Sequence, residues 1–150
     1  MLWHISLLCG LPSTQLSKLQ LVQNKAARLI TLTSRRTHIQ PVLMSLHWLP
    51  VVARINFKVL LLVYKALLGT APKYISELLV QYQPPRRLRS SSQAMLQVLK
   101  SHRVTVGDRA FSVFAPKAWN CLPHHIRQSS TIEKFKTSLK TYLYDLHYRS

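Results

Sequence analysis

The segment 46–69, LHWLPVVARINFKVLLLVYKALLG, is a long apolar stretch that contains a proline near its start and ends on a glycine. Pro50 suits the first position of a helix, where its missing N–H costs no hydrogen bond, and Gly69 suits the left-handed residue that ends a helix. We therefore expect one helix over about 51–68. This length is short for a bilayer, so we interpret the segment as a helix of a folded core and not as a membrane span.

Three cations interrupt this predicted helix. Arg54, Lys58 and Lys65 would each cost about 2.5–3.5 kcal/mol at the centre of a membrane, which also argues against a span. At about 100° per residue, they lie within about 40° of one another on the helix surface. Because the other positions are mostly apolar, the pattern predicts a helix buried on most sides that presents one narrow basic stripe to solvent or to a partner.

The charge balance of the chain is one-sided. Its 150 residues hold 21 lysines and arginines against four acids, for a formal net charge of +17. Such an excess repels itself in a compact state and favours a polyanionic partner. Nucleic acid is the first candidate, an anionic membrane surface is the second, and a solubilising charge with no specific ligand is the third. Because 47% of the residues are hydrophobic, we expect a folded core and not wholesale disorder.

Helical signals fill the rest of the first half. Ser13 or Thr14 can cap a helix that runs to about Thr33. Its apolar residues recur at helical spacing and form one seam: Leu19, Val22, Ala26 and Leu29. Basic residues flank the seam: Lys18, Lys25, Arg28 and Arg35. A short helix at 41–46, and another that begins at Pro72 and ends before Pro84, complete a helical array with proline-marked joints.

The composition changes at residues 83–93, QPPRRLRSSSQ, where adjacent prolines exclude a helix and the arginines and serines indicate an exposed basic linker. The next segment, MLQVLKSHRVTV, has the β-branched content of a hairpin, and Gly107 with Asp108 suits a turn. The aromatic segment AFSVFAPKAWNCLP then predicts irregular structure held down by Phe111, Phe114 and Trp119.

The last helix is indicated by Ser130 and Glu133, which fit a capping box. Its apolar residues share one face: Ile132, Phe135, Leu139, Tyr142 and Leu146. We therefore predict a mainly α fold with three parts. Residues 1–82 form a helical array, residues 83–93 form the basic linker, and residues 94–150 form a tail with a short β-hairpin, an irregular aromatic segment and a C-terminal helix.

The sequence lacks the residues that common catalytic sites require. Its three glycines lie far apart and its four acids are scattered, which excludes a glycine-rich phosphate loop and a two-metal carboxylate site. Cys9 and Cys121 are too few for a disulfide framework, and only half of a zinc site can be assembled around Cys121. We expect no catalytic residue, metal or cofactor. Because the N-terminus lacks the basic start of a signal peptide, we also expect a nuclear or cytoplasmic protein and not a secreted one.

Basic clusters are therefore the candidate functional residues, because they can contact phosphates without reading a sequence. They are Arg35 and Arg36; Arg54, Lys58 and Lys65; Arg86, Arg87 and Arg89; Arg103 and Arg109; and Lys134, Lys136 and Lys140. Trp48, Tyr82 and Trp119 are aromatic side chains that could stack on bases, although tryptophan in an apolar neighbourhood more often belongs to the core.

Four segments in a fixed order resemble a known protein tail. GLPSTQLSKLQLVQNKAARLI is followed by HIQPVLMSLHWLPVVARINFKVLLLVYKALLGTAPKYISELL, then by RRLRSS, then by GDRAFSVFAPKAWNCLPHHIRQSSTIEKFKTSLKTYL. Together they resemble the C-terminal part of the reverse transcriptase of LINE-type, jockey-like non-LTR retrotransposons. The resemblance runs from about Leu7 to Leu146, nearly the whole chain.

The resemblance implies that the chain handles nucleic acid without catalysis. In this family the polymerase palm carries an Asp-Asp motif, and the present residues match the region after it, which is similar to a helical thumb followed by a tail that engages template RNA and target DNA. The catalytic aspartates have no counterpart here, so we expect no polymerase activity from the chain alone. The implied partners are RNA or DNA and the palm and fingers of an intact reverse transcriptase. A basic module that binds an anionic membrane or a protein, and a non-functional relic, are the alternatives.

Overall fold

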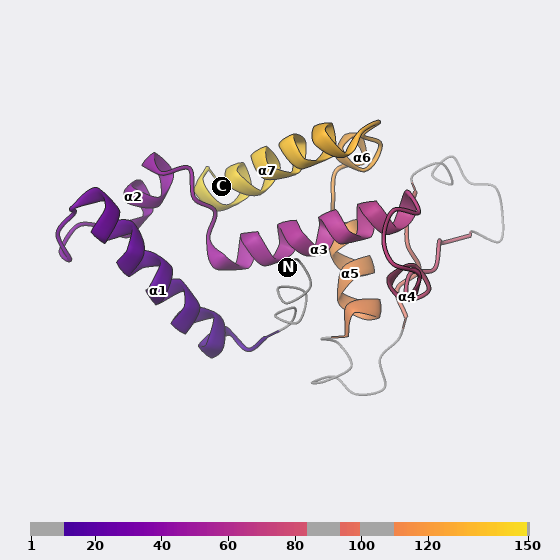
Figure 1. Cartoon of the computed structure of the whole chain (residues 1–150), viewed down its shortest axis with the longest axis horizontal. Coiled ribbons are helices and arrows are strands. Elements are labelled where there is room, and N and C mark those ends of the chain that lie inside the picture. The colour runs from indigo at the N-terminus through magenta and orange to yellow at the C-terminus, as the bar shows by residue number, and fades with distance from the viewer. Residues whose placement is uncertain (1–10, 84–93, 100–109, 150) are drawn as a thin grey trace.

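The computed structural model describes residues 11–83, 94–99 and 110–149. Within these residues the chain forms seven helices: α1 (Ser13–Thr31), α2 (Ile39–Ser45), α3 (Val51–Leu67), α4 (Lys73–Ser76), α5 (Phe111–Asn120), α6 (His124–Arg127) and α7 (Ile132–Tyr148). This described part contains no β-strand, so the prediction of a mainly α fold is confirmed there. α3 crosses the middle of the molecule, α7 lies alongside it in the opposite direction, and α1 and α2 form an arm at one end (Figure 1).

The ends of α3 are set by local sequence and lie within one residue of the prediction, because the helix covers Val51–Leu67. Pro50 is the residue immediately before the first turn. At the other end Gly69 has a φ of +70°. The N–H of Gly69 donates to the Ala66 carbonyl at 3.1 Å, and the N–H of Thr70 donates to the Lys65 carbonyl at 2.9 Å. These two bonds form the Schellman motif that a left-handed glycine permits at the end of a helix.

An aromatic cluster joins α3, α5 and α7. Tyr64 of α3 stacks on Phe135 of α7, with ring centroids 4.1 Å apart and planes 7° apart. Trp119 of α5 lies 5.9 Å from Phe135, and both rings are fully buried. The Tyr64 hydroxyl also donates to the Ser129 carbonyl at 2.6 Å. The main core is therefore shared by residues from both sides of segment 83–93.

α5 corrects the prediction of irregular structure in the aromatic segment. The segment is helical although Pro116 lies inside the helix, where a proline removes one backbone hydrogen bond at a cost of about 3 kcal/mol or more. Val113, Pro116 and Trp119 are all buried. Burial of a large apolar side chain stabilises a fold by about 1.5–3 kcal/mol, so the combined packing of these side chains outweighs the lost hydrogen bond.

The predicted hairpin is not seen in residues 94–99. Leu96 forms one isolated antiparallel bridge with Gln81, which precedes the predicted linker. The Asn120 side chain accepts a hydrogen bond from the Leu96 N–H at 2.9 Å and donates one to the Leu96 carbonyl at 2.8 Å. A side chain of α5 therefore satisfies the backbone that a second strand would otherwise pair. The rest of the predicted hairpin, with Gly107 and Asp108, and linker residues 84–93 lie outside the described residues.

The cap of α7 is one residue later than predicted. The side chain of Thr131, and not that of Ser130, accepts a hydrogen bond from the Lys134 N–H, at 3.3 Å. Glu133 binds the Lys136 ammonium at 2.7 Å. With this shift Glu133 is the second helical residue and not the third, so the capping box is replaced by a simple threonine cap and an ion pair along the helix.

The predicted apolar face of α7 is largely confirmed. Four of its members are buried or packed against the core: Ile132, Phe135, Leu139 and Tyr142. Leu146 is instead 48% exposed, and Leu143 is buried in its place. Leu143 lies four residues after Leu139, the spacing that keeps two side chains on the same side of a helix.

The predicted apolar seam of α1 lies on the outside of the molecule. All four seam residues are exposed: Leu19, Val22, Ala26 and Leu29. The side of α1 that faces the molecule carries Gln20, Gln23 and Ala27 instead. Gln23 donates to the Leu49 carbonyl at 2.8 Å, and Gln20 accepts from the Val51 N–H at 2.8 Å. Because that N–H is one of the free donors at the start of α3, polar side chains supply part of the contact between these two helices, alongside Leu16 and Val51, which pack against the main core.

The ends of α1 and the short helices also differ from the predictions. α1 begins at Ser13 directly after Pro12, without a side-chain cap from Ser13 or Thr14, and it ends two residues before the predicted Thr33. α2 covers residues 39–45 and not 41–46, and α4 is a single turn that ends well before Pro84. α4 begins directly after Pro72, as predicted.

Candidate nucleic-acid interface

The basic stripe of α3 lies on a side of that helix that the core covers only in part. Eight of its residues are buried, and they surround most of the helix. Arg54 is exposed, while Lys58 and Lys65 are half-buried. From Arg54 to Lys65 the stripe spans about 16 Å at 1.5 Å per residue. Side chains of this kind can extend an aliphatic stem over apolar surface and keep the charged end in water.

The described carboxylates are occupied by other cations. Glu77 pairs with Lys73 at 3.8 Å, Asp145 pairs with Arg149 at 3.1 Å, and Glu133 pairs with Lys136. Within the described residues, the stripe cations form no ion pair. Their charge is therefore available to an external anion.

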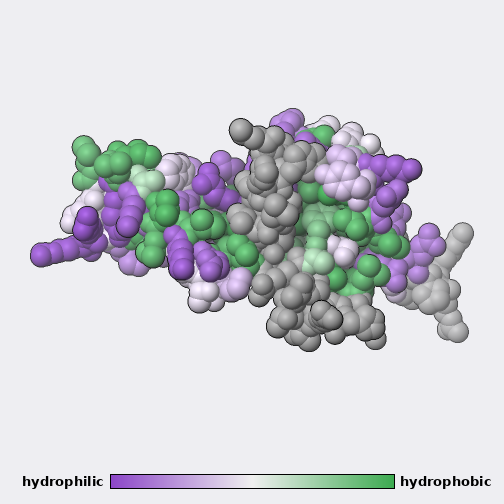
Figure 2. Space-filling view, turned by 60° about the horizontal axis from the view of Figure 1, so that its bottom comes forward, coloured by the Kyte–Doolittle hydropathy of each residue, from purple (hydrophilic) through white to green (hydrophobic). Residues whose placement is uncertain are grey.

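Two of the stripe cations also line a groove. Arg54 and Lys58 border a cavity of about 540 Å³ between α1 and α3. Its remaining lining is largely apolar and includes Val22 of α1, Trp48, and Ile55 of α3. Trp48 is half-buried there. Figure 2 shows hydrophobic and hydrophilic side chains side by side on this arm of the molecule.

The other predicted cations are distributed over separate surfaces. Arg35 and Arg36 are exposed in the connection between α1 and α2, at the far end of the arm (Figure 1). On α7, Lys136 and Lys140 are four residues apart and share one side, whereas Lys134 is on a different side and lines a shallow surface pocket with His125. The structure therefore does not gather the predicted cations into one patch.

Five predicted cations lie outside the described residues: Arg86, Arg87, Arg89, Arg103 and Arg109. The predicted contribution of the linker to binding stays a prediction. Of the predicted stacking residues, Tyr82 is 50% exposed. Trp119 is fully buried and its indole N–H donates to the Ala94 carbonyl at 2.8 Å, so this ring cannot stack on a base.

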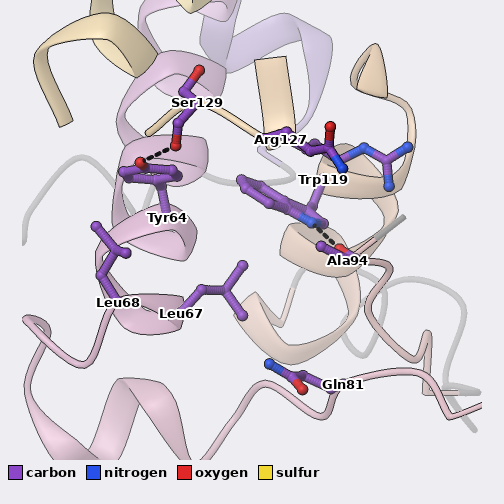
Figure 3. A pocket seen from close by; sticks show the side chains of 9 residues that line it. Tyr64, Leu67, Leu68, Gln81, Ala94, Trp119, Arg127 and Ser129 are labelled. Atoms are coloured by element: carbon purple, nitrogen blue, oxygen red, sulfur yellow. Dashed lines mark hydrogen bonds between the residues drawn. The ribbon is translucent and has the colours of Figure 1, made fainter. Parts of the chain in front are cut away.

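Arg127 is a buried cation that the sequence did not indicate. Its Nε donates to the Leu122 carbonyl at 3.2 Å and its Nη1 contacts the Met95 sulfur at 2.6 Å. Desolvation by burial lowers the pKa of this guanidinium from its usual value. Arg127 also lines a cavity of about 460 Å³ beside Tyr64 and Trp119 (Figure 3). These contacts indicate a structural role, because Arg127 links α6 to segment 94–99 through its contact with Met95.

The described residues show neither a metal site nor a membrane span. They hold no cluster of three or more histidine, cysteine or acidic side chains that could bind a metal ion. None of the described helices is long and apolar enough to cross a bilayer. Cys121 is an exposed free cysteine.

No protein-family model, no curated protein and no solved structure matches the chain significantly.

Proposed function

We propose that this chain binds the phosphate backbone of RNA or DNA through its basic surfaces, without catalysing a reaction. We further propose that it corresponds to the thumb-and-tail region of a LINE-type reverse transcriptase. The second statement rests on the resemblance of four ordered sequence segments. The first rests on charge and geometry, and each can therefore fail without the other.

The α3 stripe is the observation that carries the binding proposal. Its cations lie along one line about 16 Å long, which is about the rise of five base pairs at 3.4 Å per step. They belong to a helix that is packed in the core over most of its remaining surface, so they are held on a rigid support. Such an arrangement favours contacts with successive phosphates and gives no means of reading bases.

The expected binding is therefore insensitive to sequence and sensitive to salt. Each phosphate contact should contribute about 0.9 to the slope of log affinity against log salt on duplex DNA, and about 0.7 on single strands. Arg35 and Arg36 at the tip of the arm and Lys140 on α7 would add contacts for a long or curved polymer. The chain contributes no carboxylate cluster for magnesium in its described part, and primer extension is expected to stay at background.

A fluorescence-anisotropy titration tests this proposal. The chain is titrated into a labelled RNA hairpin at several salt concentrations, with single-stranded DNA and anionic phospholipid vesicles as competitors. We expect the logarithm of the affinity to fall linearly with the logarithm of the salt concentration. We also expect DNA, but not vesicles, to displace the labelled RNA hairpin. Salt-independent binding, or displacement mainly by vesicles, would contradict the proposal and favour a membrane-surface function.

A further inference from the structure

The exposed seam of α1 has the spacing of a helix-packing surface. Leu19 is 39% exposed, Val22 is 65% exposed and Leu29 is 77% exposed. With Ala26, these residues recur at intervals of three and four, the pattern with which one helix packs its side chains into another. The neighbouring side of α1 makes the closest contacts: Gln20 and Gln23 bind the backbone at Val51 and Leu49, and Ala27 packs with Val42 and Leu43 of α2.

The seam continues into the groove between α1 and α3. Leu19, Val22 and Ala26 form one wall of this 540 Å³ cavity, and Trp48 with Ile55 belongs to the rest of its lining. Gln23 also lines it. This side chain is 7% exposed, and its Oε1 accepts no hydrogen bond in the described structure. The groove is therefore apolar over most of its surface, with one unsatisfied acceptor beside it.

Cations border the groove on both sides. On α3, Arg54 and Lys58 line it directly. On α1, Lys18 and Lys25 are exposed, and at about 100° per residue they follow the seam on the side away from α3. Neither α1 nor α3 contains an acidic residue. An apolar floor between two basic edges thus complements an apolar helix face between two acidic edges.

We propose that this groove binds one amphipathic helix of an acidic partner protein. The apolar residues of that helix pack on the α1 seam, and carboxylates at its edges pair with the cations of α1 and α3. A second copy of this chain fits poorly, because its α1 would bring Lys18 and Lys25 against the same charges. Nucleic acid fits the cations but not the aliphatic seam. This inference does not depend on nucleic-acid binding.

The test uses the full chain and a synthetic peptide of about three heptads, with Leu at the a and d positions and Glu at the e and g positions. Fluorescence anisotropy measures its affinity for the wild type, for a Val22→Ser/Leu29→Ser variant and for Leu21→Ser. Leu21 is 58% exposed and lies off the seam, so it is the matched control. Because all three positions are exposed, circular dichroism should be unchanged.

We expect the double variant to weaken peptide binding about tenfold or more, while Leu21→Ser and the affinity for the RNA hairpin stay unchanged. A peptide with Lys at the edge positions should not bind. The proposal would be overturned if the Glu and Lys peptides bound equally well. It would also be overturned if the seam variant and Leu21→Ser lost equal affinity for the Glu peptide. It would also be overturned by a wild-type dimer that Val22→Ser converts to monomer, or by a seam that binds anionic vesicles and no peptide.

Discussion

Replacement of Phe135 by alanine probes whether α3, α5 and α7 form one cooperative core. The ring is fully buried between Tyr64 and Trp119, with centroid distances of 4.1 and 5.9 Å. Phenylalanine-to-alanine changes at such sites cost about 3–5 kcal/mol, a large part of the roughly 5–15 kcal/mol that stabilises a domain. In a chain of this size each kcal/mol lowers the melting temperature by about 2–4 °C. The substitution should therefore lower the melting temperature by about 6–20 °C.

Thermal unfolding followed by circular dichroism measures this loss. Leu29→Ala is the control, because Leu29 is 77% exposed and a surface substitution should change stability by no more than about 0.5 kcal/mol. The wild type should unfold in one transition. The account of the core would be refuted by a Phe135→Ala variant as stable as the control, or by two transitions of which only one moves. A broad, non-cooperative melt of the wild type would instead favour a poorly folded relic.

Two further predictions concern the end of α3 and the pH dependence of stability. Gly69→Ala should destabilise the chain by about 1–2 kcal/mol in denaturant titrations. The cause is conformational, because Gly69 has a φ of +70° and an added Cβ would meet no atom within 4 Å. Gly69→Asn should cost less, and equal losses for the two variants would contradict a purely conformational cause. Burial lowers the pKa of His147 from 6.5 in the folded chain, so the unfolded chain binds a proton at higher pH than the folded one. The free energy of unfolding should therefore fall as pH drops through 6.5 towards the lower folded pKa, and His147→Gln should flatten that dependence; an unchanged profile would exclude His147 as its source.

Features with local signals in the sequence were predicted well. The bounds of α3 follow from Pro50 and Gly69, because a proline and a left-handed glycine act on the backbone next to them. The face of α7 follows from the spacing of Phe135 and Leu139. Its cap was misplaced by one residue because Ser130 and Thr131 are adjacent and both can cap a helix.

Features that depend on distant contacts could not be predicted. α5 is a helix despite Pro116 because its side chains are buried against α3, which the local sequence does not reveal. Leu96 is paired by Gln81 and by the Asn120 side chain, two partners that no hairpin pattern contains. For the candidate site, the α3 stripe was predictable from helical periodicity. The exposed α1 seam was not, because periodicity identifies an apolar face without identifying what covers it.

The most direct test of the proposed function compares two charge-matched triple variants in the RNA titration. One replaces the stripe cations Arg54, Lys58 and Lys65 by Gln. The other replaces Lys73, Lys136 and Arg149, which already pair with carboxylates, and so removes the same total charge. We predict that the stripe variant lowers the salt slope by about two to three units and weakens binding to every sequence, while the ion-paired variant changes both much less. Equal losses in the two variants would mean that net charge alone, and not the stripe of α3, binds the polymer.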